Sequence, residues 1–164
     1  MKKIVQKEDV VLRKIAKEIP ENKITSKEIK QVIKNMFESL AGEEDGVALA
    51  APQIGESLRI FIISPKIFDN PEKEHLVFIN PKILKKSNDK KKMDEGCLSC
   101  RWFYGTTKRA SRIELEAYDE NGQKFKMTGT KLIAQIFQHE TDHLEGILFL
   151  DHATNLKELK PEDE

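Results

Sequence analysis

The sequence predicts an α+β fold in which antiparallel strands and a hairpin pack around a central C-terminal helix, with another helix near the N-terminus. Three patterns indicate this class. Apolar residues recur at helical spacing in segments 25–41 and 130–145. Two short runs rich in β-branched and aromatic residues, 58–64 and 75–80, are bounded by prolines, as strands often are. Segment 112–128 alternates apolar and charged residues and turns at an Asn-Gly pair.

The length and composition favour one domain. A chain of 164 residues can bury a hydrophobic core without disulfides, and we expect residues 1–164 to form a single domain whose tail frays after about residue 155. Lysine and arginine total 28, as do aspartate and glutamate, so no overall basic bias marks a nucleic-acid binder. No apolar run approaches the length of a signal-peptide core or a membrane span. We therefore expect a cytoplasmic monomer that binds neither nucleic acid nor membrane directly.

Boundary signals place the individual elements. The first helix has Ser26 as its N-cap and Gly42 past its end. The run 87–96 is so highly charged that we expect a surface connection there. The hairpin turns at Asn121-Gly122, and the last helix runs over 130–145 until a glycine ends it.

The last helix carries two histidines on its apolar face. At about 100° per residue, four side chains lie within roughly 60° of one another on a stripe that faces the core: Leu132, Ile136, His139 and His143. Two core histidines satisfied by hydrogen bonds would explain this. However, the His-Glu-x-x-His pattern (HExxH) is typical of helices that bind a divalent metal, with Glu140 as a general base.

A metal site needs a third ligand, and the sequence after this helix offers no good one. Zinc proteases with this helix use a histidine six residues after the second histidine, or a glutamate further on; here the first slot is Phe149, and the chain ends in a charged tail. The third ligand is therefore expected upstream, from Cys97, Cys100, His75 or a carboxylate. Cys97 follows Gly96, which allows a tight approach of the chain, and a thiolate suits a borderline-soft cation.

A third stretch, residues 45–55, is rich in small residues but lacks the lysine and spaced glycines of a phosphate loop. A close-packed turn that leads into a strand explains it as well as a binding loop does. Within it, Gln53 is the residue that can offer a directional hydrogen bond.

The three stretches, taken in this order, resemble the motifs of the peptide deformylases. The chain has GVALAAPQ at 46–53, EGCLS at 95–99 and QHETDHLEG at 138–146, and the resemblance extends from about residue 4 to residue 152. It implies one catalytic domain that hydrolyses the N-formyl group of the N-terminal formylmethionine of newly made polypeptides and releases formate. The implied partners are N-formylmethionyl nascent peptides near the ribosome exit. The implied cofactor is one divalent metal, Fe²⁺ in the first place, with Zn²⁺ or Ni²⁺ as alternatives.

The resemblance also assigns roles to residues. The implied metal ligands are Cys97, His139 and His143. Glu140 would be the acid/base, and Gln53 with the backbone N–H of Leu98 would donate to the oxyanion. The implied substrate-binding residues are Gly46, Val47, Ala48, Leu132 and Ile136. Glu95 would pair with Arg109 just outside the ligands.

Three positions depart from the family's pattern. Ala48 stands where glycine is usual, in a segment that lies against the substrate backbone in the family. Cys100 replaces a branched apolar residue, and Gln135 lies on the helix turn that borders the methionine pocket. None of the three is a catalytic group, so they bear on substrate preference rather than on the reaction.

The main alternative is a closed structural zinc site in a binding module, with four ligands: Cys97, Cys100, His139 and His143. Cysteines three apart usually ligate from a tight knuckle, whereas on an extended strand residues 97 and 100 point to opposite faces. A metalloprotease is a second alternative, which the absence of the downstream ligand disfavours.

Overall fold

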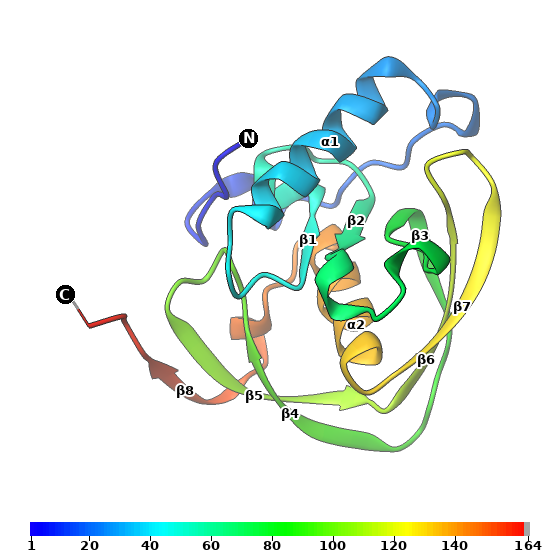
Figure 1. The fold of residues 1–164 in the computed structure, drawn as a ribbon. Helices are drawn as coiled ribbons and strands as arrows, with labels where there is room; N and C mark the ends of the chain where they lie inside the picture. Colours follow the sequence, from blue (N-terminus) through cyan, green and yellow to red (C-terminus); the bar gives the residue numbers. More distant parts are fainter. Residues whose placement is uncertain (163–164) are drawn as a thin grey trace.

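Two antiparallel sheets and two α-helices form the molecule in the computed structural model, which describes residues 1–162. The helices are α1 (Lys27–Ala41) and α2 (Lys131–Leu144). The larger sheet has the order β1-β2-β3-β6-β7, with strands Ala48–Ala50, Ile60–Ile63, Val77–Lys86, Arg112–Tyr118 and Lys124–Thr130. The smaller sheet has the order β4-β5-β8, with strands Lys90–Gly96, Phe103–Ala110 and Thr154–Glu158. In Figure 1 the strands curve around α2, so the expected mixed class of helices and antiparallel sheet is confirmed.

Helix α1 begins and ends where its sequence signals indicated. The Ser26 Oγ accepts a hydrogen bond from the N–H of Ile29 at 3.4 Å, and Gly42 caps the other end. Its apolar face is buried against the larger sheet, with Met36 fully enclosed. Within residues 1–162 no helix is both long and apolar enough to cross a membrane.

The hairpin of β6 and β7 supplies the other face of the core. Alternate residues of β6 are buried, and Gly122 adopts a φ of +80° in the turn, a conformation that favours glycine. Three aromatic rings then join the sheet to α2: Phe61 stacks on Phe78 at 4.5 Å, and Phe137 of α2 meets Phe78 edge-on at 5.5 Å. This packing fixes the helix that carries the histidines.

The charged run 87–96 is not a simple surface connection, contrary to the prediction. Residues 90–96 form strand β4, which pairs along its whole length with β5, from Lys90 opposite Ala110 to Gly96 opposite Tyr104. The prediction treated the lysines as evidence for a loop. However, β4 is an edge strand of its sheet, and charged side chains are well tolerated on edge strands. As a result, β4 carries Glu95 to a buried position, and Cys97 follows directly after the end of the strand.

The tail is also more ordered than predicted. We expected fraying after about residue 155, but β8 continues to Glu158 and pairs with β5, and the N–H of Leu159 donates to the Trp102 carbonyl at 2.9 Å. The free edge of β5 provides backbone partners that composition alone does not reveal.

Candidate metal centre and substrate cavity

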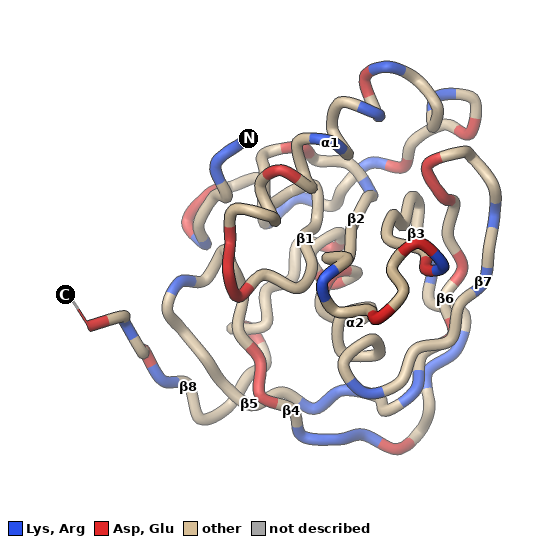
Figure 2. Tube along the Cα trace, viewed as in Figure 1, with Lys and Arg blue, Asp and Glu red and all other residues tan. Residues whose placement is uncertain are grey.

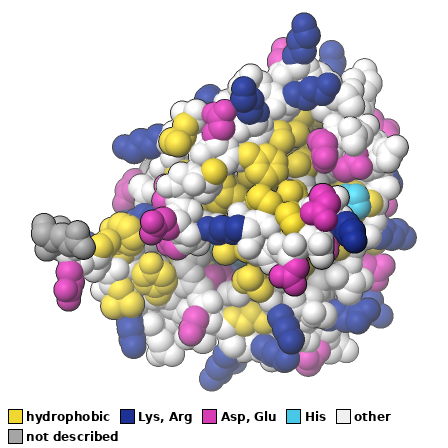
Figure 3. Space-filling view, viewed as in Figure 1, with side chains coloured by type: hydrophobic (Ala, Val, Ile, Leu, Met, Phe, Trp, Pro, Cys, Tyr) yellow, Lys and Arg dark blue, Asp and Glu magenta, His cyan; other side chains and the backbone are white. Residues whose placement is uncertain are grey.

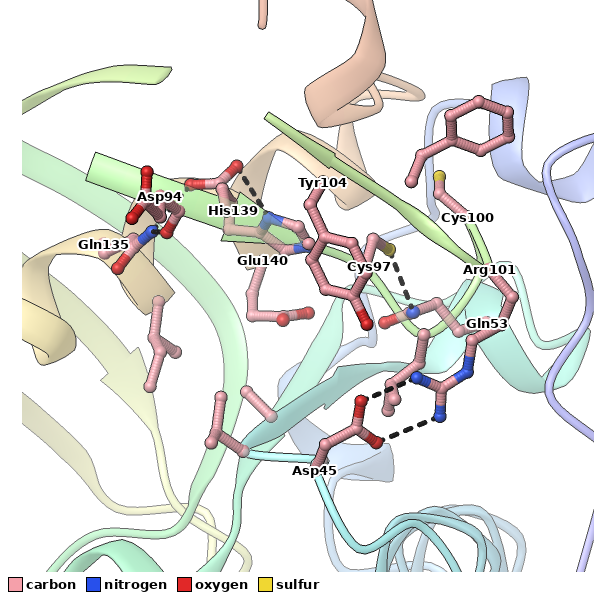
Figure 4. Close-up of a pocket in the computed structure, with 18 of the residues that line it drawn as sticks. Asp45, Gln53, Asp94, Cys97, Cys100, Arg101, Tyr104, Gln135, His139 and Glu140 are labelled. Carbon is pink, nitrogen blue, oxygen red and sulfur yellow. Dashed lines mark hydrogen bonds and ion pairs between the residues drawn. The ribbon is translucent and has the colours of Figure 1, made fainter. Parts of the chain in front are cut away.

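Three side chains from distant parts of the chain converge beside α2. The ligand atoms of Cys97, His139 and His143 all lie within 4.8 Å of one another, and the Cys97 Sγ lies 3.4 Å from the His143 Nε2. The histidines are one helical turn apart, with ring centroids 4.9 Å apart. Figure 4 shows Cys97, His139 and Glu140 facing the same cavity.

The turn after β4 places the thiol. The Cys100 N–H donates to the Cys97 carbonyl at 3.0 Å, and the Ser99 N–H points at the Cys97 Sγ at 3.4 Å. A hydrogen bond with Cys100, together with burial, raises the pKa of the Cys97 thiol well above its usual value. A bound cation is the natural counterion for its thiolate form.

The two imidazoles differ in their electrostatic surroundings. Burial holds the pKa of His143 well below its ordinary value, so the ring is neutral. Burial also opposes the charged form of His139, but the hydrogen bond to Glu95 and the negative charges of Glu140 and Glu95 together outweigh it, so the pKa of His139 is raised. Two imidazoles and one thiol with an accessible face match the donor set of a divalent transition metal.

Glu95 is the buried centre of the network behind His139. Its Oε2 lies 3.0 Å from the His139 Nδ1 and accepts from the Arg109 Nη2 at 2.6 Å, while the Arg109 Nε donates to Oε1 at 3.1 Å. Burial alone would raise the pKa of Glu95, but the hydrogen bonds from His139 and Arg109 hold it well below the usual range. Arg109 also pairs with Asp142 at 2.7 Å, so this carboxylate belongs to the network rather than to solvent.

Sequence reasoning missed two further donors to Glu95. The Thr107 Oγ1 and the Gln135 Nε2 each donate to its Oε1 at 3.2 Å, and Gln135 also donates to the Asp94 carbonyl at 2.8 Å. The contact of Gln135 could have been suspected from the sequence, because Gln135 is a polar residue at a position that borders the expected pocket. Nothing in the sequence pointed to the contact of Thr107, since its partner is set only by the pairing of β4 with β5.

Glu140 is buried beside the cluster, and one of its carboxylate oxygens, Oε2, has no hydrogen-bond partner within residues 1–162. The residue is 3% exposed. Burial raises its pKa to about 7. A carboxyl group with such a pKa can both accept and return a proton near neutral pH.

Gln53 comes from the turn after β1 and faces the thiol from the other side. Its Oε1 accepts from the Ala50 N–H at 2.9 Å, and its Nε2 donates to the Ser99 Oγ at 3.1 Å and more weakly to the Cys97 Sγ at 3.7 Å. The amide is therefore oriented with its hydrogens toward the cluster. The small-residue stretch 45–55 is therefore a turn that also lines the cavity, through residues such as Gly46 and Gln53.

Gln6 and Arg101 fix the loop around Leu98, and neither was expected from the sequence. The Gln6 Nε2 donates to the Leu98 carbonyl at 3.0 Å. Arg101 forms a bidentate pair with Asp45, at 2.7 and 3.0 Å, and a further pair with Glu43 at 2.7 Å. Figure 4 shows the Arg101–Asp45 pair at one side of the cavity, joining its two walls.

A cavity of about 280 Å³ opens beside Glu140 and the Cys97 turn. All five expected substrate-binding residues line it: Gly46, Val47, Ala48, Leu132 and Ile136. Ile136 is buried as predicted, but Leu132 is 45% exposed at the rim rather than facing the core. Leu132 lies in the first turn of α2, and the first buried residue of the helix is Ala134. Figure 3 shows apolar side chains gathered in the middle of this face.

The remaining histidines and cysteine lie outside the cluster. His75 stacks on Phe125 at 3.7 Å, and the His152 Nε2 lies 3.6 Å from Asp142. Cys100 is 1% exposed in an apolar cluster with Leu12 and Phe149, and its sulfur is not among the converging ligand atoms.

Comparison with known proteins decides the family. The family model described as polypeptide deformylase matches residues 1–159. The chain belongs to the peptide deformylase family. A peptide deformylase of Dehalococcoides mccartyi is 38% identical over 168 residues, which cover all of this chain and 95% of that protein. The crystal structure of a Legionella pneumophila peptide deformylase aligns with a TM-score of 0.83 and 36% identity, over 94% of this chain and 87% of that one. The Thermotoga maritima structure aligns with a TM-score of 0.82 and 32% identity, over 94% and 98%.

The function follows from membership of this family. The chain is a peptide deformylase, a hydrolase that removes the N-formyl group from newly made polypeptides and so acts in protein biosynthesis. The family also implies a catalytic divalent metal, and the cluster of one thiol and two imidazoles fits such a cation.

Proposed function

We propose that Cys97, His139 and His143 are the metal ligands of this peptide deformylase and that Glu140 is its acid/base. The observation that carries the proposal is the convergence of three ligand atoms beside a buried carboxyl group whose Oε2 has no hydrogen-bond partner among residues 1–162. Fe²⁺ is the proposed native metal, and Zn²⁺ and Ni²⁺ suit the same ligands. Residues 1–164 form the single catalytic domain.

The chain's own groups supply the proton transfers and hold the substrate. A divalent cation, when bound here, would polarise the formyl carbonyl and make a water molecule more acidic. Glu140 takes the proton of the attacking water, whose oxygen forms a bond to the formyl carbon. Glu140 then gives this proton to the departing amine as the C–N bond breaks, so formate and a free N-terminal methionine are the products.

Gln53 and Leu98 stabilise the negative charge that develops on the formyl oxygen. The Gln53 Nε2 holds the Cys97 Sγ only weakly, at 3.7 Å, so this hydrogen is the one available to the oxyanion. The Leu98 N–H is the second donor, on a loop whose position Gln6 and Arg101 fix.

The cavity holds the first side chain of the substrate and one stretch of its backbone. Leu132 and Ile136 provide apolar walls for the methionine side chain, and Gly46, Val47 and Ala48 lie along the peptide. We further propose that the enzyme is a cytoplasmic monomer acting near the ribosome exit, where N-formylmethionyl chains emerge.

Formate release from formyl-Met-Ala-Ser tests the proposal, with acetyl-Met-Ala-Ser as the matched control. The expected result is hydrolysis of the formyl peptide alone, activity lost with a chelator, and activity regained with Fe²⁺, Ni²⁺ or Zn²⁺. Equal hydrolysis of both peptides, or full activity after complete removal of metal, would overturn it.

A further inference from the structure

Two consecutive residues near the N-terminus contact both loops that carry the proposed oxyanion donors. The Val5 N–H donates to the Gln53 carbonyl at 2.9 Å, and the Gln6 Nε2 donates to the Leu98 carbonyl at 3.0 Å. In Figure 1 the N-terminal segment lies beside the turn after β1 and the loop between β4 and β5, two parts of the chain that are far apart in sequence. We call Val5 and Gln6 the N-terminal brace.

The side chain of Gln6 pairs with the loop as a neighbouring strand would. Its Oε1 accepts from the Arg101 N–H at 3.2 Å, while its Nε2 holds the Leu98 carbonyl. A carboxamide carries both a donor and an acceptor, so one side chain satisfies two backbone groups of the same loop. The turn within the loop is closed by the Cys100 N–H, which donates to the Cys97 carbonyl at 3.0 Å. The loop is therefore held from inside by this turn and from outside by Gln6.

The brace is itself anchored to the core. Ile4 is 8% exposed in the core cluster that includes the buried face of α1, whereas Val5 packs against a second apolar cluster that includes Phe149. Before the brace, the Lys2 N–H donates to the Ser39 Oγ of α1 at 3.0 Å. Figure 2 shows charged residues in the N-terminal segment on both sides of an uncharged stretch, which contains the brace. The brace is thus a fixed part of the fold.

Both oxyanion donors depend on the placement of the loops that the brace contacts. The Leu98 N–H and the Leu98 carbonyl belong to the same residue, so a fixed carbonyl limits the backbone rotation that would swing the N–H away. The Gln53 Oε1 accepts from the Ala50 N–H at 2.9 Å, which orients the side chain, and the Gln53 backbone is held by Val5. Oxyanion donors are effective when they lie about 2.7–3.1 Å from the developing charge. A contact that fixes both loops at once also fixes the distance between the two donors.

Packing alone does not account for the brace. Val5 is apolar, and its partial burial needs no further reason. Gln6 is polar and half-buried, and the donor and the acceptor of its carboxamide are both used on one loop. Neither residue lines the substrate cavity, so the brace does not contact a substrate held there. Any effect of Gln6 on the reaction must therefore pass through the residues that it holds.

We propose that the N-terminal brace sets the spacing of the two oxyanion donors and that Gln6 is a positioning residue for deformylation. This inference rests on the proposed function, in which Gln53 and the Leu98 N–H stabilise the oxyanion. Removal of the Gln6 carboxamide should leave the metal ligands and the cavity walls in place but free the loop that carries Leu98. The loss is expected in turnover, because a misplaced donor stabilises the transition state less while binding of the ground state is unchanged.

The test compares Gln6→Met with Gln31→Met. Methionine keeps roughly the length of glutamine without its carboxamide, and Gln31, an exposed residue of α1, provides the matched control. Gln6→Glu is a second variant, which keeps an acceptor for the Arg101 N–H but lacks the donor to the Leu98 carbonyl. Metal content, unfolding midpoint and steady-state kinetics with formyl-Met-Ala-Ser are measured on each protein. NMR relaxation of the Leu98 amide is measured on the zinc-loaded forms.

The expected result for Gln6→Met is a kcat lower by about 10–100-fold, with KM within about twofold and stoichiometric metal. The order parameter of the Leu98 amide should fall from about 0.85, typical of a rigid backbone, to below about 0.6. Gln6→Glu should show the same pattern, and it decides the question if Gln6→Met does not fold. Gln31→Met should match the wild type in every measurement.

An unchanged kcat in a folded Gln6 variant would overturn the proposal, as would a Leu98 amide that stays as ordered as in the wild type. A raised KM at constant kcat, or a loss of metal in parallel with activity, would also overturn it. Failure of both Gln6 variants to fold would show a purely structural role. Failure of the proposed function is distinguishable from all of these, because the wild-type enzyme itself would then release no formate.

Discussion

The Glu95 Oε2 lies 3.0 Å from the His139 Nδ1, so Nε2 is the nitrogen of that ring left for a metal. Glu95 is itself held by Arg109 and is 6% exposed, which makes it a rigid support for the imidazole. A carboxylate in this position orients a ligand and increases its basicity. The metal site therefore depends on a pair of residues from β4 and β5 as much as on the helix.

Glu95→Gln should weaken the metal site from outside the ligand set. The amide keeps the volume but loses the charge that orients His139 and neutralises Arg109, so metal affinity is expected to fall about 10–100-fold. The free energy of unfolding should fall by about 3 kcal/mol, because Arg109 is 5% exposed and loses one of its two anionic partners. Only Asp142 then remains to neutralise it. Chelator competition and urea unfolding measure the two effects. Glu120→Gln, at an exposed position, is the control, and metal affinity equal to wild type in Glu95→Gln would contradict this role.

Glu140→Gln should separate chemistry from metal binding. The variant is expected to keep stoichiometric metal and lose at least about 10²-fold in kcat, the low end for a positioned acid/base. Its unfolding midpoint without metal should be unchanged or higher, because the Glu140 Oε2 accepts no hydrogen bond from the described part of the chain, residues 1–162. Metal analysis and steady-state kinetics check this, with His143→Ala as the contrast that loses both metal and activity. Loss of metal in Glu140→Gln would make this residue a ligand instead.

Local signals in the sequence located the helices and the hairpin, because capping at Ser26 and the turn at Gly122 depend on neighbouring residues. They failed where a distant partner decides the structure. Residues 90–96 became a strand because β5 lies beside them, and the tail became β8 for the same reason. A charged composition gave no indication of either pairing.

The motifs picked out three residues, Cys97, His139 and His143, whose ligand atoms the fold brings within 4.8 Å of one another. The supporting contacts were harder to predict. Thr107 and Gln6 reach the site through strand register and loop packing, which no spacing rule reveals. The exposure of Leu132 was not predicted, because helical spacing shows in which direction around the axis a side chain points. It does not show how deeply each turn of the helix is buried in the protein.

Gln53→Leu should act on the transition state. Leucine keeps roughly the volume of the side chain but removes the Nε2 donor, so kcat is expected to fall about 10²–10³-fold. The Michaelis constant should change little, because the interaction strengthens only as charge develops on the formyl oxygen. Initial-rate kinetics with formyl-Met-Ala-Ser distinguish the two parameters. An unchanged kcat with a raised KM would show that Gln53 binds the ground state.

Arg101→Gln should affect substrate binding more than chemistry. Arg101 joins the loop before β1 to the loop after β4 through Asp45 and Glu43, and these loops form opposite walls of the cavity. Without this link the walls are less well fixed, and KM is expected to rise about 3–10-fold. The kcat should stay within about twofold, because Gln6 still holds the Leu98 carbonyl and the backbone N–H of residue 101. Asp45→Asn should have a similar effect. The double variant should be no worse than Arg101→Gln alone, since both changes remove one interaction, and additive losses would refute the coupling.

The two cysteines decide between an open catalytic site and a closed structural one. Cys97 is one of the three residues whose ligand atoms converge, whereas Cys100 is packed with Leu12 and Phe149 in an apolar cluster. Cys97→Ala is therefore expected to abolish both metal binding and deformylation. Cys100→Ala should keep both, at a stability cost of about 1 kcal/mol for the packing lost.

Metal content, formate release and unfolding midpoints measured on both cysteine variants make the comparison. Exchange among Fe²⁺, Ni²⁺ and Zn²⁺ should change the rate without changing this pattern, because the ligands stay the same. If Cys100→Ala instead released the metal while remaining folded, Cys100 would be a fourth ligand. No coordination position would then remain for water, and the roles proposed here for Glu140 and Gln53 would fail together.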